Sequence, residues 1–165
     1  YIFALAIAQG GAILIGQLVG RKKINAAYTI GKRIMRLGTT SSVTLSLITA
    51  IFGTYILGML TSDPWIISTG SVILWIEVLL ENGRALNFFG VNALRSSGDI
   101  YFPVIIGIIV MWGVQVVGSY VLGITFGWGL IAMWAVFALD ENIRGFIFLR
   151  RWNTFKWVGK SFTDN

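Results

Sequence analysis

The chain has 165 residues, of which 56% are hydrophobic and only 12% are charged, and its net charge is +6. A soluble domain usually carries about 25% charged residues, so this composition excludes an ordinary water-soluble globule. Cysteine and histidine are absent from the sequence, which excludes disulfides, Cys/His zinc sites, thiol nucleophiles and His-based catalysis. The composition therefore predicts an integral membrane protein.

Five apolar stretches are long enough to cross a bilayer as helices, which takes about 20 residues each. We expect these spans at about 1–19, 37–60, 65–91, 102–122 and 128–149. The predicted fold class is an all-α polytopic membrane bundle over residues 1–149, followed by a basic cytoplasmic tail at 150–165. The first span begins within an apolar run that no basic region precedes. We therefore expect a fragment cut near its N-terminus rather than a signal peptide.

Turn-forming residues separate the spans. Residues 61–64 form a breaker in which Pro64 suits the first helical turn after a Ser or Asp cap. Residues 96–99, with Pro103 close behind, predict a second turn, and the glycines at 123–129 predict a third. The basic link at 21–36 is expected to contain a short amphipathic helix that lies in the membrane interface.

The thirteen Lys and Arg residues fall into three groups. Six lie between the first two spans, Arg84 and Arg95 form the second group, and five lie at the end of the fifth span and in the tail. A five-span arrangement places all three groups on one side, which the positive-inside rule assigns to the cytoplasm. Because these charges lie at the ends of apolar runs, they indicate membrane topology rather than nucleic-acid binding. We expect a multi-pass protein of the plasma membrane, the bacterial inner membrane.

The third span carries a polar stripe. At 100° per residue, one face about 140° wide holds six polar side chains. They are Glu77, Glu81, Arg84, Asn87, Asn92 and Arg95. The opposite face carries apolar positions such as Leu79 and Phe89. Ionisable groups at this depth cost several kcal/mol unless they are paired or wetted, so the stripe is expected to face a bundle interior or a water-filled cavity.

Glu77 and Glu81 are an i, i+4 carboxylate pair that resists ionisation of both members at once. Such a pair suits reversible binding of a proton or cation, so we predict an ion-coupling site at Glu81 and Glu77, with Arg84 as the countercharge. The alternative is a buried Glu81–Arg84 ion pair with a structural role alone. That alternative does not explain the other polar residues on the same face, and a solvated functional cavity is favoured.

Further polar and aromatic residues lie in the last two spans. Asp140 and Arg144 are i, i+4 partners near the inner end of the fifth span, where a structural clamp is the favoured interpretation. In the fourth span, Gln115 and Trp112 are candidate residues of a substrate cavity, together with Asn87 and Asn92 of the stripe. Bridging between helices is the favoured role for Gln115, and packing is the favoured role for Trp112, with a place in the cavity as the alternative for each.

Several of these stretches resemble the C-terminal part of the multidrug and toxic compound extrusion (MATE) transporters. The turn Leu94-Arg95-Ser96-Ser97-Gly98-Asp99 is the most specific of them. The others are residues 16–21, 26–28, 81–87 and 92–93, Phe102-Pro103, residues 140–145, and Arg151-Trp152 through Trp157, and together they cover nearly all of the chain.

The resemblance implies a twelve-helix, two-lobed transporter in which this chain supplies helices eight to twelve. It implies export of small organic, often cationic, compounds in exchange for Na⁺ or H⁺, without a cofactor. The implied partners are the lipid bilayer, the substrate and an N-terminal lobe of the same protein. Arg95 and Asp99 of the turn, with Asp140 and Arg144, are then expected to have structural or gating roles.

One position departs from the family pattern. In the best-known branch a cation-coupling aspartate lies eleven residues before the arginine of the turn, and this chain has Arg84 there, one turn after Glu81. The resemblance therefore implies a different arrangement of the coupling site. In this arrangement Glu81 or Glu77 binds the coupling ion in place of the aspartate, and Arg84 is a built-in countercharge.

Three other functions are weaker interpretations. A flippase for lipid-linked sugars, from the same superfamily, would need a strongly basic lateral cavity for pyrophosphate, whereas the intramembrane charges here are of both signs. A non-transporting scaffold would have no reason to bury a carboxylate pair. An enzyme is the weakest of the three, because the sequence shows no catalytic constellation.

Overall fold

A computed structural model describes residues 2–160 of the chain, and the side chains of residues 5–160. Every regular element in this part of the chain is a helix, which confirms the predicted all-α bundle. The helices are α1 (Ile2–Gly20), α2 (Ile24–Ile51), α3 (Gly53–Leu60), α4 (Pro64–Ser96), α5 (Tyr101–Val110), the π-helical turns η1 (Met111–Val116) and η2 (Ser119–Thr125), and α6 (Gly129–Asn153). Residue 1 of the first predicted span and residues 161–165 of the predicted tail lie outside the described residues.

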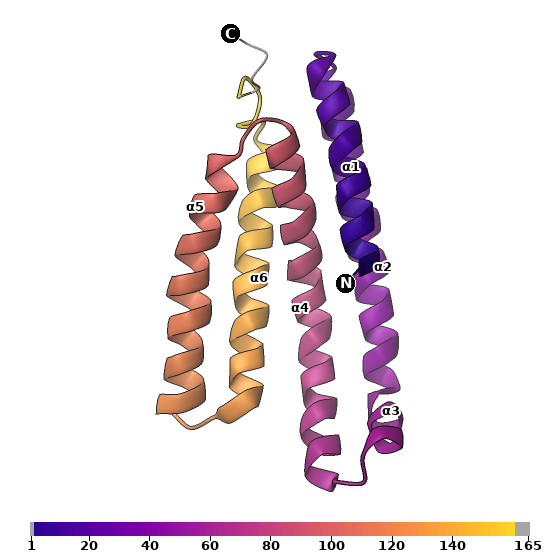
Figure 1. The fold of residues 1–165 in the computed structure, drawn as a ribbon, viewed down its shortest axis with the longest axis vertical. Helices are drawn as coiled ribbons and strands as arrows, with labels where there is room; N and C mark the ends of the chain where they lie inside the picture. The colour runs from indigo at the N-terminus through magenta and orange to yellow at the C-terminus, as the bar shows by residue number, and fades with distance from the viewer. Residues whose placement is uncertain (1, 161–165) are drawn as a thin grey trace.

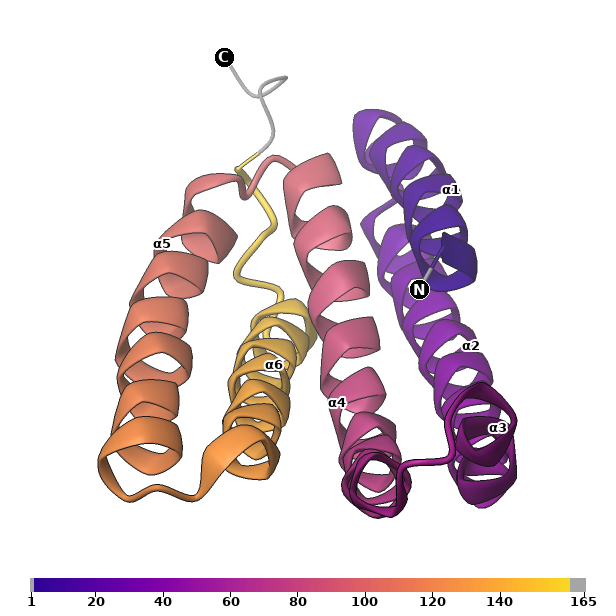
Figure 2. The same cartoon turned by 60° about the horizontal axis from the view of Figure 1, so that its bottom comes forward.

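α4 is the central helix of the bundle. It packs most extensively on α6, and its other side packs on α2 and α1 (Figure 1). α5 lies on the far side of α6 from the α1–α2 pair, and Figure 2 shows α6 between α5 and α4 from a second direction. α4 and α6 run in the same direction, so residues at matching positions along the two helices can meet at one level.

Within the described part of the chain, three helices are both long and apolar enough to cross a membrane: Ile24–Ile51, Pro64–Ser96 and Tyr101–Thr125. α1 contributes a shorter apolar helix, Leu5–Gly20. α6 has 25 residues, which is long enough to span, but it carries Asp140, Glu141 and Arg144 near its middle. These helices fit a multi-pass membrane bundle.

The basic link does not form a separate interfacial helix, contrary to expectation. The chain turns at residues 21–23, where Lys22 has a φ of 57°, and α2 then runs without a break from Ile24 to Ile51. α2 contains no proline, and its buried glycines Gly31 and Gly38 lie against Trp152 and Phe89. The six basic residues of the link therefore belong to a tight turn and to the first turns of a spanning helix.

The second and fourth predicted spans differ from simple α-helices. The second consists of the last part of α2 and of α3, separated at Phe52, where Gly53 lies against Leu74 of α4. The fourth continues from α5 through η1 and η2 as one 25-residue helix, Tyr101–Thr125. The third span begins as predicted, because Asp63 caps α4 and accepts hydrogen bonds from the backbone amides of Trp65 (2.8 Å) and Ile66 (3.4 Å).

The turns and the helix end that carry most of the Lys and Arg residues lie at the same end of the bundle, whereas Arg84 and Arg144 lie deeper along α4 and α6. The α1–α2 turn, the α4–α5 turn and the C-terminal end of α6 are all at the top of Figure 1. This is the end that the sequence assigns to the cytoplasm. At the opposite end, the connections before α4 and before α6 carry no Lys or Arg.

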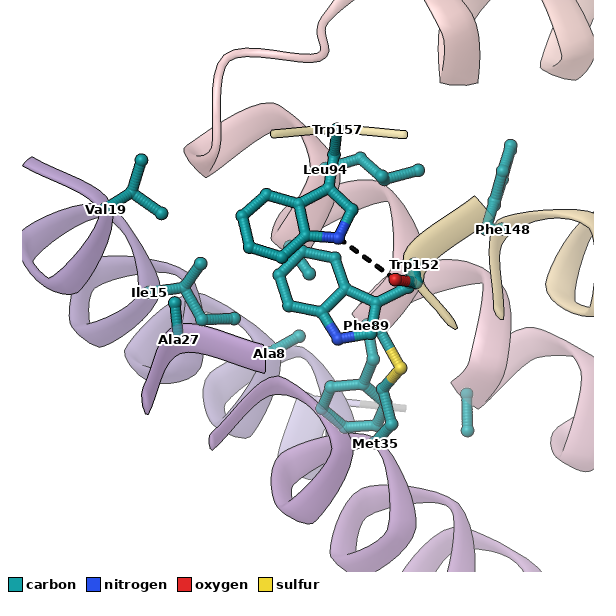
Figure 3. Close-up of a cluster of buried hydrophobic side chains, with 12 residues drawn as sticks. Ala8, Ile15, Val19, Ala27, Met35, Phe89, Leu94, Phe148, Trp152 and Trp157 are labelled. Atoms are coloured by element: carbon teal, nitrogen blue, oxygen red, sulfur yellow. Dashed lines mark hydrogen bonds between the residues drawn. The ribbon is translucent and has the colours of Figure 1, made fainter. Parts of the chain in front are cut away.

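A buried apolar cluster near this end joins α1, α2, α4 and α6 (Figure 3). Its fully buried members include Trp152 and Trp157, whose rings stack with centroids 4.2 Å apart. The Trp157 indole N–H donates to the carbonyl of Trp152 at 3.0 Å. The predicted tail is therefore partly ordered structure, because residues 150–153 end α6 and the following residues fold back to bury Trp157.

Candidate functional site

Two matching tetrapeptides meet where α4 and α6 pack together. α4 carries Glu81-Asn82-Gly83-Arg84, and α6 carries Glu141-Asn142-Ile143-Arg144, so both have the pattern E-N-x-R. Because the helices are parallel, the two motifs lie side by side. The Asn82 amide donates to the Asn142 side-chain oxygen at 2.9 Å, and the Asn142 amide donates to the Leu79 carbonyl of α4 at 2.8 Å.

Two glycines permit this close approach. A Cβ atom on Gly83 would lie 2.6 Å from the carbonyl carbon of Glu141 and 2.7 Å from the Cα of Asn142. A Cβ on Gly145 would lie 2.8 Å from the carbonyl oxygen of Gly83. The backbones of α4 and α6 therefore touch at this level, as small residues allow in membrane helices.

The first charge cluster surrounds Arg84 on α4. Its guanidinium forms an ion pair with Glu77 at 3.0 Å and a second, shorter one with Glu81. The other oxygen of Glu77 accepts a hydrogen bond from the Trp134 indole N–H of α6 at 3.0 Å. Arg84 also lies over the Phe137 ring, 5.5 Å from the centroid. The cluster is thus built on α4 and anchored to α6.

The second charge cluster surrounds Arg144 on α6. Arg144 pairs with Asp140 and, at 3.2 Å, with Glu141. The other Glu141 oxygen accepts from the Asn87 amide of α4 at 2.7 Å, which ties this cluster to α4 as well. Asp140 is fully buried, and its Oδ1 has no hydrogen-bond partner among the described residues.

The two clusters together contain an excess of negative charge. Four carboxylates (Glu77, Glu81, Asp140 and Glu141) surround two guanidiniums, so the fully ionised network carries two net negative charges. Glu81 lies about 25 Å along the α4 axis from Pro64, in a helix about 50 Å long, which places the network deep in the bundle. Uncompensated charge at such depth costs several kcal/mol, so the network favours uptake of a proton or a cation.

The part of the predicted polar stripe from Glu77 to Asn87 therefore faces α6, whereas Arg95 is exposed. The side chains of Glu77 and Arg84 remain 24% and 16% exposed, so the edge of the network is accessible from the surface of this chain. The predicted structural alternative, a Glu81–Arg84 ion pair, is present, but Glu77 and Trp134 are joined to it. Phe89 on the opposite face packs against α2, as expected for a face that meets a neighbouring helix.

The four predicted cavity residues do not gather around one cavity. Asn87 is buried against Glu141, and the Asn92 amide donates to the Phe88 carbonyl of its own helix at 2.8 Å. Gln115 lines a separate hollow of about 480 Å³ between the π-helical part of the fourth span and α6. Trp112 is 59% exposed on the surface of this chain.

The predicted structural residues separate into two places. Asp140 and Arg144 form the expected i, i+4 pair, but they lie within the charge network rather than in an isolated clamp. Asp99 is buried in the α4–α5 turn and accepts from Arg151 of α6 at 2.8 Å, while Arg95 is exposed. The turn is therefore joined to the end of α6.

Sequence reasoning missed the partners that α6 contributes to the stripe. Glu141, Trp134 and Asn142 all bond to residues of α4. The signal that could have identified two of them is the repeated E-N-x-R tetrapeptide. Among the residues that the structure describes, no group of three or more Asp, Glu, His or Cys side chains is placed to hold a metal ion.

Comparison with known proteins assigns the chain to a family. The MatE family model matches residues 1–121. The chain belongs to the MatE family. This MatE chain is 36% identical over 159 residues to the "Uncharacterized transporter YisQ" of Bacillus subtilis, a match that covers 96% of the chain and 35% of the relative.

A second MatE relative is more distant. The "Probable multidrug resistance protein NorM" of Neisseria meningitidis serogroup B is 23% identical over 143 residues, covering 87% of the chain and 31% of the relative. The chain spans about a third of the length of the curated relatives it matches. No solved structure matches it.

Proposed function

We propose that this MatE chain forms the C-terminal lobe of a secondary antiporter that exports organic cations in exchange for protons. Membership of a transporter family supports the general class. The single observation that supports cation coupling is the deep network in which four carboxylates face two guanidiniums. A flippase for pyrophosphate-linked lipids would need excess positive charge at this depth.

The surroundings of the carboxylates favour a proton over a sodium ion. The partners of Glu77 and Glu81 are N–H donors, from the Arg84 guanidinium and the Trp134 indole. The partners of Glu141 are likewise N–H donors. A bound Na⁺ needs oxygen ligands and is repelled by an adjacent guanidinium, whereas a proton needs only one carboxylate oxygen.

Protonation of Glu81 or Glu77 changes the net charge of the network. When Glu81 binds a proton, Arg84 keeps one charged partner, Glu77, and the network loses a negative charge. When the proton leaves, the network regains the charge and attracts a cationic substrate to its exposed edge. Exchange is based on competition between the proton and the organic cation for this excess negative charge. Movement of this lobe against an N-terminal lobe exposes the network to each side of the membrane in turn.

The proposed orientation follows the basic end of the bundle. In a bacterial plasma membrane, the α1–α2 turn, the α4–α5 turn and the end of α6 face the cytoplasm. The network is then reached from inside by the cationic substrate and from outside by protons that move down their gradient.

The proposal is tested in the longest native reading frame that contains this chain, reconstituted in proteoliposomes. An inward proton gradient should drive efflux of a fluorescent organic cation such as ethidium. Glu81→Gln should lower the initial rate on the order of tenfold or more, because it removes the titrating group and keeps the side-chain volume. Asp63→Asn is the matched control, because Asp63 is an exposed carboxylate on the same helix, outside the network, and Asn also caps helices.

Two outcomes would contradict this function. Unchanged proton-driven efflux in the double variant Glu77→Gln/Glu81→Gln would show that these carboxylates are not needed for coupling. Efflux that is driven by a sodium gradient and unaffected by the proton gradient would identify Na⁺, not the proton, as the coupling ion.

A further inference from the structure

A basic hollow lies where α5 begins and α6 ends, beyond the charge network toward the C-terminal end of α6. Its volume is about 270 Å³. Its lining combines apolar side chains from the ends of the two helices with polar and basic side chains: Phe102, Ile147, Arg150, Arg151, Thr154 and Lys156. It therefore places apolar side chains beside positively charged ones.

Of the three basic residues of the hollow, only Arg151 has a carboxylate partner among the described residues. Arg151 is held in place, because its Nε donates to Asp99 at 2.8 Å and its guanidinium lies over the Phe102 ring, 4.2 Å from the centroid. Within the described residues, no carboxylate lies at ion-pair distance from Arg150 or Lys156. Two positive charges at the hollow therefore remain free to bind an anion.

The position of Lys156 is fixed by its neighbours in the chain. Phe155 has a φ of 56°, in the left-handed region, and its ring packs 4.5 Å from that of Tyr28. On the other side, Trp157 is fully buried and stacked on Trp152. Because both flanking residues are anchored, Lys156 is placed at the hollow before any ligand binds, which lowers the entropic cost of binding.

An exposed apolar face of α5 begins beside the hollow, at Tyr101, the chain neighbour of the lining residue Phe102. Tyr101, Ile105 and Ile108 lie on one face at i, i+4 and i+7, and they are 81%, 53% and 54% exposed. α5 is the first part of the spanning helix Tyr101–Thr125, so this face runs from the membrane boundary into the bilayer. An anion bound in the hollow can therefore carry a hydrocarbon chain that follows α5.

We propose that the hollow binds the phosphate of an anionic glycerophospholipid, with the headgroup at Arg150 and Lys156 and an acyl chain along α5. Guanidinium and ammonium groups both form charge-assisted hydrogen bonds to phosphate oxygens. Basic pockets between membrane helices at the headgroup level are suited to such lipids. Free inorganic phosphate presents the same anionic group as the lipid headgroup. The exposed apolar face of α5 beside the hollow favours the lipid. The site does not depend on the proposed transport function.

The test uses native mass spectrometry of the full-length protein in detergent with added phosphatidylglycerol or phosphatidylcholine. The double variant Arg150→Gln/Lys156→Gln should weaken phosphatidylglycerol binding on the order of tenfold. Arg151 is left intact because it holds Asp99. Arg21→Gln/Lys23→Gln is the matched control, since both residues are exposed at the same end and the change in net charge is equal. The conservative double variant Arg150→Lys/Lys156→Arg should retain the lipid and rules out loss through misfolding.

Three outcomes would overturn the assignment. They are equal phosphatidylglycerol binding by the Gln double variant, equal binding of phosphatidylcholine by the unchanged protein, and displacement of the lipid by excess inorganic phosphate. The last outcome would assign the hollow to free phosphate. The lipid site is supported if only the Gln double variant binds phosphatidylglycerol more weakly and if inorganic phosphate does not displace the lipid from the unchanged protein.

Discussion

Replacement of Gly83 by alanine tests whether the close contact of α4 and α6 holds the charge network together. The added Cβ would lie 2.6 Å from the Glu141 carbonyl carbon and 2.7 Å from the Asn142 Cα. These are backbone atoms that cannot rotate away. Ordinary carbon–carbon contacts are about 3.5–4.0 Å, so the two helices must separate by about 1 Å.

The cost follows from the interhelical hydrogen bonds at this level. The Asn82–Asn142, Asn142–Leu79 and Asn87–Glu141 bonds measure 2.9, 2.8 and 2.7 Å. A separation of about 1 Å extends each beyond hydrogen-bond distance. At about 0.6–1 kcal/mol each in a membrane protein, their loss costs about 2 kcal/mol. Residual overpacking adds about 1–3 kcal/mol, and the higher helix propensity of alanine recovers about 1 kcal/mol.

We therefore expect Gly83→Ala to lower the free energy of unfolding by about 2–4 kcal/mol. The measurement is denaturation of the purified full-length protein in detergent, followed by tryptophan fluorescence. Gly107→Ala is the control, because nothing described lies within 4 Å of a Cβ at Gly107 in the middle of α5. If Gly83→Ala proved as stable as Gly107→Ala, the helices would not be in backbone contact and the geometry of the network would be wrong.

Two further predictions concern the predicted cytoplasmic end. Asp99→Asn should lower stability by about 2 kcal/mol, because it leaves the largely buried Arg151 without a charged partner. Thermal unfolding measures this loss, and the exposed Asp63→Asn should be neutral. Trp157→Ala should cost about 3–5 kcal/mol and expose the tail to limited proteolysis, because the indole is fully buried. Trp65→Ala, at a 68% exposed position, should change neither property.

Helical spacing was sufficient to predict contacts within one helix. The Glu81–Arg84 and Asp140–Arg144 pairs lie three and four residues apart, so any α-helix brings them together. The apolar stretches likewise fall in helices, and Asp63 caps α4 where the turn residues indicated. These features depend only on local geometry.

Contacts between helices could not be predicted from periodicity. The Glu77–Trp134 and Asn87–Glu141 bonds depend on the rotation and depth of α6 relative to α4, which the pattern of one helix does not define. The continuity of α2 was missed for a related reason. The basic residues at 21–36 suggest an interfacial helix, but packing of Gly31 and Gly38 against Trp152 and Phe89 keeps this segment within α2.

The central claim is that the network exchanges a proton for an organic cation. The most direct measurement is the number of protons released when ethidium binds to the purified full-length protein in a weakly buffered solution. We expect release of about one proton per bound cation, and none in Glu77→Gln/Glu81→Gln. Cation binding with no proton release by the unchanged protein, or with equal release by the double variant, would contradict the claim.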